Sequence, residues 1–422
     1  MTGPTTSRTS TARPTEAVPR GSAATNGGGA SHENEATGTG SSPLPRWLAV
    51  AVAVAFGAFI GVPLVATVFG VNPARLENRA PSARPQLTPG ALLDDETYGQ
   101  LTEYLTDRFA FRSLAIRANA RLNADVWHSD TGRVRRGVDG WLFLDESLRR
   151  LCTERIEPAV AVDALDRMND AVAGDGERSF HLVIGPAKST IYPELLGEEA
   201  DNAGCVLNAV EEMRADLAEH EGEWYVDVYG PVLRLKEELD DESGGVYLDR
   251  DTHWTEYGGM AMVAQVLDRV APGVFDPADV AEVGVQPLEG DLSRILGLPE
   301  TYEVVDLEVD RKGVSTTELE SRAVEGSYPI RRFVSEANTA PLVEGSTLML
   351  FDSYTFPVIE EMAPYFEELT LVHWDAVGAV DVAAMIADAD HVIVQVAERN
   401  LTFRVGEKLF DADLLDQLLE GP

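Results

Sequence analysis

From about residue 159 onward the chain alternates short apolar runs with helix-forming stretches, and this rhythm limits the folds that it can adopt. The apolar runs are rich in β-branched residues and carry few charged ones, which is typical of strands buried on both faces. The alternation predicts an α/β fold, in which a parallel sheet is covered by helices on both faces. The expected strands are 180–184, 224–228, 347–351, 369–372 and 391–396, and the expected helices are 159–173, 208–219, 231–239, 256–271, 356–366 and 380–387.

Residues 47–69 contain no charged side chain. A helix of this length extends about 34 Å, which exceeds the roughly 30 Å apolar thickness of a bilayer. The apolar core of a signal peptide has only about 7–15 residues, so we expect a retained single-pass anchor rather than a cleaved signal. Arg46 precedes this segment, whereas Arg75, Arg79 and Arg84 follow it. Counted alone, these charges would place the C-terminal domain in the cytoplasm, although long domains translocate largely regardless of them.

The remaining parts of the chain differ in composition. Residues 1–46 are mainly Thr, Ser, Gly, Ala and Pro, which predicts a disordered tail. Residues 70–136 combine a proline-punctuated linker with a helical segment, and 137–422 form the main domain. The segment 274–340 breaks the strand–helix rhythm, so we expect a loop-rich insertion there. Residues 407–419 have apolar positions at helical spacing, which favours a short helix packed on the core.

Composition excludes some classes of function. The chain has 71 acidic and 34 basic residues, a formal charge of −37, so we expect no nucleic-acid partner. Seven histidines and two cysteines show no metal-ligand spacing. We therefore expect no metal and no cofactor.

Asp251 and His253 stand two residues apart, directly before a helix for which Thr255 is a good N-cap. A carboxylate beside an imidazole fixes its tautomer and stabilises the imidazolium, as in the base half of a nucleophilic triad. For an isolated pair of this kind, packing of His253 or capping of the helix by Asp251 is the commoner explanation.

Ser353 follows the apolar run 348–351 and Asp352. An α/β fold places a nucleophile on such a tight turn at the end of a central strand, where the backbone N–H of the serine is free to bind an oxyanion. A serine after a strand is more often only a cap. Because the Asp-x-His pair occurs in the same chain, we interpret Ser353, His253 and Asp251 as one site.

Seven short motifs occur in order between residues 72 and 401. They are Glu77-Asn78-Arg79, Asp107-Arg108-Phe109, Asp139-Gly140-Trp141-Leu142-Phe143, the run 185–194 with Lys188 and Tyr192-Pro193, Asp251-Thr252-His253-Trp254, Gly290-Asp291-Leu292 and Glu398-Arg399. In these motifs the chain resembles the AlgX/AlgJ group of SGNH hydrolase-like proteins, the alginate O-acetyltransferase type. The Asp-x-His-Trp stretch is the most specific of them.

The resemblance implies a flavodoxin-like SGNH fold with a permuted motif order, in which the Asp and His precede the Ser. It implies that Ser353 is the nucleophile, His253 the general base and Asp251 the orienting carboxylate. The expected reaction is acyl transfer through a covalent serine ester, with backbone N–H groups stabilising the oxyanion. None of the motifs specifies the acceptor.

The family acts on extracellular polysaccharide, often with a multi-spanning membrane O-acyltransferase as the acyl donor. The resemblance thus implies a cell-surface polysaccharide and such a membrane protein as partners. It also favours an extracytoplasmic C-terminal domain held at the cell membrane by the anchor 47–69. In an exported domain, Cys152 and Cys205 are expected to form a disulfide, since they are the only two cysteines and both follow the anchor.

Four further residues are weaker site candidates for substrate or oxyanion contacts. Tyr354 and Arg399 are expected to shape the site, although a salt bridge at the sheet edge is an equal explanation for Arg399. Trp254 could stack on a sugar ring or belong to the core. Lys188, after a strand end, could meet an anionic substrate or be an ordinary solvated lysine.

Three alternatives to the transferase stay open. A polysaccharide acetylesterase of the same fold would use water in place of the sugar hydroxyl. The second is a glycan-binding or assembly protein with a decayed site. It is suggested by Phe351, which replaces the glycine of the family's Gly-Asp-Ser motif. Glycine allows backbone conformations that other residues avoid, so the replacement could change the geometry of the serine loop. An unrelated secreted structural protein is the third.

Overall fold

The computed structural model describes residues 45–68, 95–107, 118, 132–153, 158–174, 176–220, 223–239, 245–324 and 327–401. The chain divides into two units, Met1–Ala58 and Phe59–Pro422, and the sheet and the site belong to the second. Helix α1 (Arg46–Val68) covers most of the expected anchor, which ends at Phe69, outside the described residues. None of the helices formed by described residues is both long and apolar enough to cross a membrane.

Several predictions of the sequence analysis fall outside the described residues. These are almost all of the tail 1–46, the helix 407–419, the motif at 77–79 and part of the motif at 107–109. Within the segment 70–136 the structure describes helix α2 (Asp95–Asp107), which lies inside the stretch 91–126 where the sequence predicts a helical pattern.

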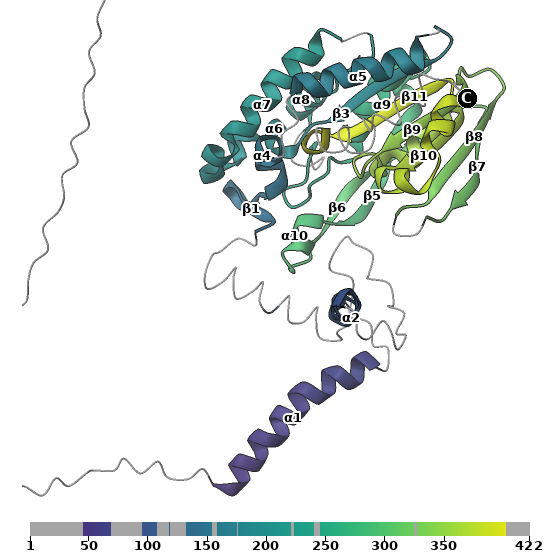
Figure 1. The fold of residues 1–422 in the computed structure, drawn as a ribbon. Helices are drawn as coiled ribbons and strands as arrows, with labels where there is room; N and C mark the ends of the chain where they lie inside the picture. The colour runs from purple at the N-terminus through teal and green to yellow at the C-terminus, as the bar shows by residue number, and fades with distance from the viewer. Residues whose placement is uncertain are drawn as a thin grey trace, which may run out of the picture. The chain divides into compact units, whose positions relative to one another are not determined.

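A seven-stranded sheet forms the centre of the main domain, in the order β4-β3-β11-β9-β10-β8-β7 (Figure 1). Its strands are β3 (Ser179–Gly185), β4 (Tyr225–Val226), β7 (Val314–Arg322), β8 (Ile330–Ala337), β9 (Val343–Phe351), β10 (Phe366–His373) and β11 (His391–Ala397). The five strands from β4 to β10 run parallel, and they are the five that the apolar runs predict. Strands β8 and β7 are antiparallel additions, so the sheet is mixed rather than wholly parallel.

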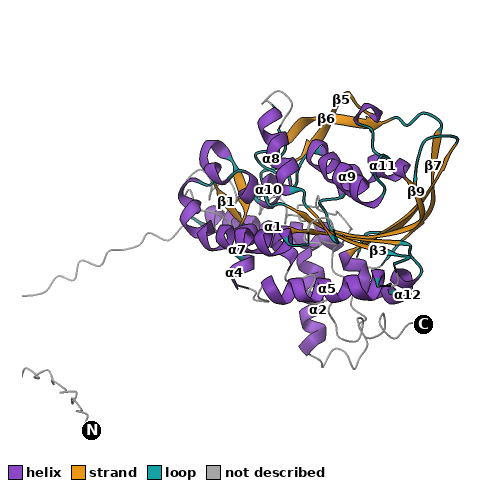
Figure 2. Cartoon of the chain, turned by 90° about the horizontal axis from the view of Figure 1, so that it is seen from above, coloured by secondary structure: helices purple, strands orange, loops and turns teal. Residues whose placement is uncertain are grey.

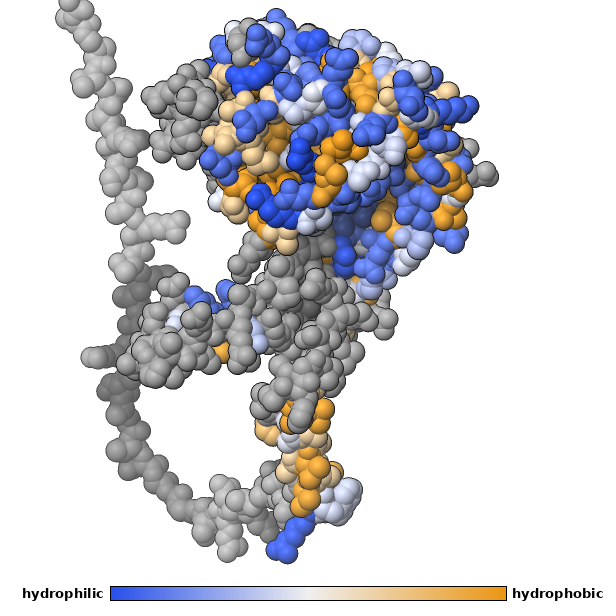
Figure 3. Space-filling view, turned by 90° about the vertical axis from the view of Figure 1, so that its right-hand side faces the viewer, coloured by the Kyte–Doolittle hydropathy of each residue, from blue (hydrophilic) through white to orange (hydrophobic). Residues whose placement is uncertain are grey.

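The prediction of a loop-rich insertion at 274–340 is wrong. This segment forms β7 and β8, and also an antiparallel pair of β5 (Val280–Glu289) and β6 (Thr301–Val309). Strands β5 and β7 are exposed along most of their length. β7 carries mainly polar side chains and therefore lacks the apolar period of a buried strand, whereas β5 leaves apolar residues such as Val283 and Val285 exposed. Cross-strand polar contacts stabilise β7 instead, among them the bidentate pair of Arg331 and Glu318. Seen from the side of β7 and β8, hydrophilic and apolar residues are interspersed on the surface (Figure 3).

Helices cover both faces of the sheet (Figure 2). Leu182 and Ile184 of β3 pack with helices α5, α7 and α12, whereas Val183 packs with α8, α9 and α11 on the opposite face. These helices are α5 (Pro158–Ala173), α7 (Ala200–Ala218), α8 (Tyr229–Glu238), α9 (Glu256–Val270), α11 (Ile359–Met362) and α12 (Val382–Ala387). The smaller elements are β1 (Val134–Arg136), β2 (Leu142–Leu144), α4 (Arg150–Thr153), α6 (Lys188–Ile191) and α10 (Asp291–Ile295).

The predicted helix 356–366 is not continuous. It consists of α11 between two 3-10 turns, η9 (Phe356–Val358) and η10 (Ala363–Tyr365). Each of the two turns has a proline in its first positions. Proline favours the start of a helical turn and breaks a helix interior, which explains the interruption.

Cys152 of α4 and Cys205 of α7 form a disulfide, as predicted, with their Cα atoms 6.3 Å apart. The bond links α4, which precedes α5 in the chain, to α7. It closes a loop of 53 residues.

We expect the disulfide to stabilise the domain by about 2–4 kcal/mol, because a cross-link over a loop of this length restricts the unfolded chain. The free energy of unfolding should therefore fall by this amount in Cys152→Ala, Cys205→Ala and the double variant alike, since each breaks the same bond. Equal denaturation curves with and without reductant would contradict the expectation. So would two free thiols found by mass spectrometry in protein from its native compartment.

Candidate active site

An isolated β-bridge between Tyr247 and Trp254 closes the turn that carries the Asp-x-His pair. Helix α9 starts directly after this turn, with Thr255 at the N-cap position. Thr255 occupies the predicted N-cap position, but its side chain makes no capping hydrogen bond. Its hydroxyl donates instead to the carbonyls of Gly245 and Val246, at 3.0 and 3.3 Å. The residue thus fastens the base of the turn.

Ser353 lies on the turn that follows β9 and is half-buried. The turn is held by its neighbour Asp352, whose carboxylate accepts the N–H groups of Tyr354 (3.1 Å) and Ala397 (2.6 Å). The backbone N–H of Asp352 donates in turn to the side chain of Gln395, at 2.9 Å. Both outer partners belong to β11, so the neighbouring parallel strand positions the serine. Asp352 has a positioning role that the sequence analysis did not assign.

The structure brings Ser353, His253 and Asp251 together. His253 Nε2 lies 2.8 Å from Ser353 Oγ, and His253 Nδ1 lies 2.9 Å from Asp251 Oδ1. The same Asp251 oxygen also accepts the backbone N–H of His253, at 2.8 Å. This order, from carboxylate to imidazole to hydroxyl, can activate a serine for nucleophilic attack.

Asp291, the first residue of α10, is a second buried carboxylate in the site. Its backbone N–H donates to Asp251 Oδ2 (2.9 Å), and its own Oδ1 accepts the N–H of Thr252 (2.7 Å). The sequence analysis found Asp291 only as part of a family motif and gave it no role. Gly290 before it must be small, since a Cβ there would lie 2.6 Å from the carbonyl oxygen of Arg250.

The charges of these groups are coupled. Burial would raise the pKa of Asp251, but its hydrogen bonds with His253 and the backbone lower it to about 2. Burial would likewise lower the pKa of His253, but its hydrogen bond to Asp251 and the negative charges of Asp291 and Asp251 raise it. Burial and the charge of Asp251 raise the pKa of Asp291. Asp251 is therefore the firmly ionised carboxylate of the pair.

Asp251, His253 and Asp291 also place one potential metal-ligand atom each within 4.8 Å of one another. Both Asp251 oxygens already accept hydrogen bonds, and both ring nitrogens of His253 are engaged. A cation could bind here only by displacing the contacts that orient His253. The arrangement fits a hydrogen-bonded catalytic group better than a metal centre.

Tyr354, Arg399 and Trp254 lie behind the site rather than on its surface. Tyr354 donates its hydroxyl to the carbonyl of Thr252 (3.2 Å), and its ring stands edge-on to His253. Arg399 is buried and donates to the Tyr354 hydroxyl at 3.5 Å. Trp254 is 2% exposed and donates to the Tyr354 carbonyl at 2.7 Å, so it belongs to the core and cannot stack on a sugar.

Lys188 is 4% exposed, and its ammonium group donates to three backbone carbonyls. An ammonium group has three N–H donors, so none is left for a ligand. The interpretation of Lys188 as a contact for an anionic substrate is therefore wrong.

Phe351 is compatible with the serine turn. It is the last residue of β9, its backbone is not among the positive-φ residues of the described chain, and its ring is buried edge-on against Phe356 and His373. No glycine conformation is needed at this position, since the strand is extended there. The distance of 2.8 Å between Ser353 and His253 is reached with the phenylalanine in place.

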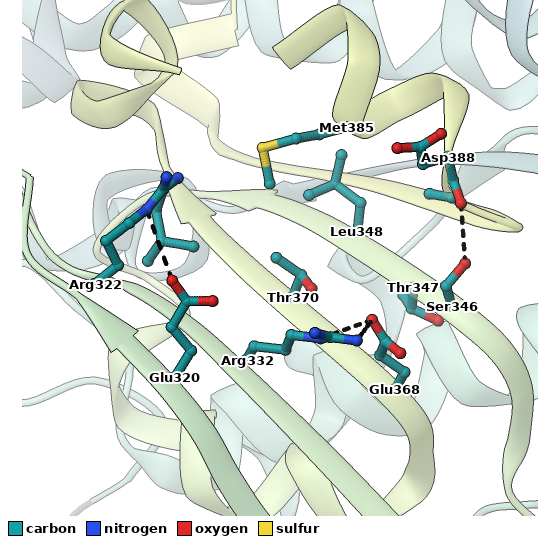
Figure 4. Close-up of a pocket in the computed structure, with 12 residues that line it drawn as sticks. Glu320, Arg322, Arg332, Ser346, Thr347, Leu348, Glu368, Thr370, Met385 and Asp388 are labelled. Atoms are coloured by element: carbon teal, nitrogen blue, oxygen red, sulfur yellow. Dashed lines mark hydrogen bonds and ion pairs between the residues drawn. The ribbon is translucent and has the colours of Figure 1, made fainter. Parts of the chain in front are cut away.

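A hollow of about 320 Å³ lies elsewhere on the sheet, over β7 to β10 and α12 (Figure 4). It is lined by Glu320, Arg322, Ile330, Arg332, Ser346, Thr347, Leu348, Glu368, Thr370, Met385, Asp388 and Ala389, none of which belongs to the site at Ser353. Arg332 pairs with Glu368 at 2.7 Å, and Arg322 with Glu320 at 3.9 Å. The hollow therefore offers paired charges and no nucleophile–base pair.

We expect the pKa of His253, measured by NMR titration, to lie above 6.5 and to fall in Asp251→Asn, because burial then outweighs the remaining attraction. A raised folded-state pKa stabilises the fold fully below the unfolded-state pKa, and this stabilisation is lost as the pH rises through the folded-state pKa. Asp251→Asn should thus cost more stability at pH 5.5 than above the pKa of His253. His391 is the control, since its pKa should be the same in the wild type and in Asp251→Asn. An unchanged pKa of His253 would contradict the coupling.

Residues 134–328 match the family described as "SGNH hydrolase-like domain, acetyltransferase AlgX". The match includes Asp251, His253 and Asp291 and ends before Ser353. The chain is 27% identical over 199 residues to the probable alginate O-acetylase AlgJ of Pseudomonas syringae pv. tomato, which is 46% of this chain and 48% of that protein. It is 24% identical over 206 residues to the AlgJ of Azotobacter vinelandii, or 48% of this chain and 51% of that protein.

The chain spans about half the length of these curated relatives. Among solved structures, it is similar to the O-acetyltransferase domain of Pseudomonas putida AlgJ, with 17% identity and a TM-score of 0.42 over 68% of this chain and 98% of that one. The similarity rests on the sequence match and on the order of the motifs. Residues 134–328 are thus similar to the SGNH hydrolase-like domain of the AlgX type.

Proposed function

We propose that this protein is an O-acetyltransferase that carries an acetyl group on Ser353 and passes it to a hydroxyl group of a cell-surface polysaccharide. The observation that carries the proposal is the unbroken series of hydrogen bonds from Asp251 through His253 to Ser353. The names of the similar proteins, probable alginate O-acetylases, support the class of reaction.

In the first half-reaction, Ser353 Oγ attacks the carbonyl carbon of an acetyl ester while His253 Nε2 accepts the hydroxyl proton. Asp251 stabilises the imidazolium that forms. The developing oxyanion needs donors, and the backbone N–H of Ser353 donates to no residue that the structure describes. The donor's alcohol then leaves with the proton from His253, and an acetyl ester remains on Ser353.

In the second half-reaction, a sugar hydroxyl replaces the departed alcohol. His253 accepts its proton, the sugar oxygen attacks the acetyl carbonyl, and the bond to Ser353 Oγ breaks. The proton returns to Ser353, which restores the starting state. Ser353 and His253 are both half-buried, so they are the members of the site that a substrate can reach, whereas Asp251 is buried.

The proposed partners are a polysaccharide acceptor and a multi-spanning membrane O-acyltransferase that supplies the acetyl group. The name "alginate" belongs to the similar proteins and is not extended to this acceptor. Water in place of the sugar would make the protein an acetylesterase, and the distinction depends on the second half-reaction alone.

The proposed location is the cell membrane, with a single-pass anchor at 47–69 and the catalytic domain outside the cytoplasm. The uncharged length of this segment supports an anchor. The disulfide between Cys152 and Cys205 supports an oxidising compartment for the domain.

To test the reaction, the full chain would receive an aryl acetate as donor and a panel of oligosaccharides as acceptors, with products identified by mass spectrometry. Ser353→Ala should reduce sugar acetylation to background, and His253→Ala should cost a similar factor because nucleophile and base act as one unit. Asp251→Asn should retain roughly 10- to 100-fold more activity than these two variants. Ser346→Ala, on the same strand but away from the site, should stay active.

The other outcomes separate the alternatives. If acetate is released and none of the oligosaccharides becomes acetylated, the result would favour the esterase. A folded protein in which a serine-directed acyl probe fails to label Ser353 would favour a glycan-binding protein. If Asp251→Asn were as severe as Ser353→Ala and also lowered the melting temperature by several degrees, Asp251 would be chiefly structural.

For the location, we expect the chain to sediment with membranes and to resist extraction by high salt, because an apolar span is held by the hydrophobic effect rather than by charge. Protease added to intact cells or spheroplasts should remove the C-terminal domain. Deletion of 47–69 should release the domain from membranes. Protection of the C-terminal domain in intact cells would contradict the orientation, and sedimentation without 47–69 would contradict the anchor.

A further inference from the structure

We propose that Lys188 is a positioning residue of the site: its buried ammonium group ties together the backbone of the turn that presents Asp251 and His253. The inference rests on the proposed function, since it assigns a role in the same site. It also explains two motifs that the triad leaves without a role, the one around Lys188 and the one around Trp141.

The hydrogen bonds of the Lys188 ammonium group all go to that turn. Nζ donates to the carbonyl oxygens of Leu248 (3.1 Å), Asp249 (3.0 Å) and Asp251 (2.6 Å). The shortest of the three is to Asp251, whose carboxylate orients His253. Without the ammonium group, three carbonyls that converge in a buried place would have no common donor. Their mutual repulsion would shift the turn and, with it, the Asp251 carboxylate.

The backbone that carries Lys188 is itself fixed. Lys188 is the first residue of α6, which follows β3 directly. Glu398, directly after β11, accepts hydrogen bonds from the hydroxyl of Thr190 (2.7 Å), the N–H of Ala187 (3.3 Å) and the hydroxyl of Tyr229 (2.9 Å). The backbone of Lys188 is thus fixed independently of the turn, so the side chain reaches the turn from a fixed base. This is what a positioning group requires.

Aromatic rings close the other side of the ammonium group. The ring centroids of Trp141 and Phe143 each lie 5.3 Å from Lys188 Nζ, within the range of cation–π attraction. Leu142, between them, donates its N–H to the carbonyl of Asp249, at 2.8 Å. The β1–β2 segment therefore contacts both the lysine and the turn, which accounts for its Trp-Leu-Phe motif.

Burial is the main cause that lowers the pKa of Lys188, to about 7, against the attraction of Asp251, Asp291 and Asp249. These three carboxylates are the charged groups that act on the ammonium group. Because water is excluded, each contact of the ammonium group is stronger. When the group is removed, solvent does not take its place, and the position of Asp251 should change.

Lys236 offers a matched control. Its Nζ also donates to a backbone carbonyl, that of Ile191 (2.6 Å), and to Glu194 (2.7 Å), and it lies 4.3 Å from the ring centroid of Tyr192. None of these three contacts is with the turn that carries Asp251. Removing it should test the loss of a lysine of similar chemistry without an effect on the triad.

The experiment measures the rate of acylation of Ser353 by a serine-directed acyl probe, well below the melting temperature, for Lys188→Met and Lys236→Met in the full chain. We expect Lys188→Met to lower the rate by roughly 10- to 100-fold, which is less than the loss in Asp251→Asn because the carboxylate is shifted rather than removed, and Lys236→Met to leave the rate within twofold. The double variant Lys188→Met/Asp251→Asn should lose little more than Asp251→Asn alone, since both act on the same group. Additive losses, or an unchanged rate in Lys188→Met, would overturn the proposal.

Two further measurements keep the result decisive. If Lys188→Met does not fold, Lys188→Gln keeps an N–H donor of similar reach and should show a smaller loss in the same direction. The pKa of His253, read by NMR, should fall in the lysine variant toward its value in Asp251→Asn, and an unchanged value would count against the proposal. If the wild-type protein is not labelled at Ser353, the proposed function fails, whereas the shift at His253 still tests the lysine.

Discussion

The buried carboxylate of Asp251 is the interaction on which the site depends. Its two oxygens receive N–H groups from the ring and backbone of His253 and from the backbone of Asp291. Burial of a charge costs several kcal/mol unless the charge is paired and hydrogen-bonded. These donors come from the turn before α9 and from the start of α10. The carboxylate can therefore be buried in its ionised form only when both elements are in place.

The carboxyl ends of the parallel strands supply the second part of the site. Parallel strands end on the same side of a sheet, so residues that follow β3, β9 and β11 meet there although they are far apart in sequence. β11 fastens the serine turn through Gln395 and Ala397, and Glu398 fastens α6 after β3. Nucleophile and base thus rest on a common rigid scaffold, which keeps them at hydrogen-bond distance.

The segment 274–340 belongs to this scaffold rather than lying beside it. It supplies Asp291, and its strands β5 and β6 pack on α9, the helix that follows the Asp-x-His turn. Glu256, the first residue of α9, accepts the N–H of Leu307 at 2.6 Å and the amide of Gln286 at 2.5 Å. A segment that has no apolar period of its own therefore fixes the start of the helix next to the base.

What the sequence determined by itself was the layered α/β core and the identity of three convergent residues. The five parallel strands are buried on both faces, so their apolar runs are visible without any structure, and short-range motifs mark Asp251, His253 and Ser353. Only the tertiary structure decided the rest. Strands β5, β7 and β8 pair with neighbouring strands but lack the regular burial pattern of a strand in the core, so no apolar period marks them in the sequence. Trp254 is a core residue and Lys188 a buried donor because of residues about 60 to 100 positions away, and such burial is not encoded in local spacing.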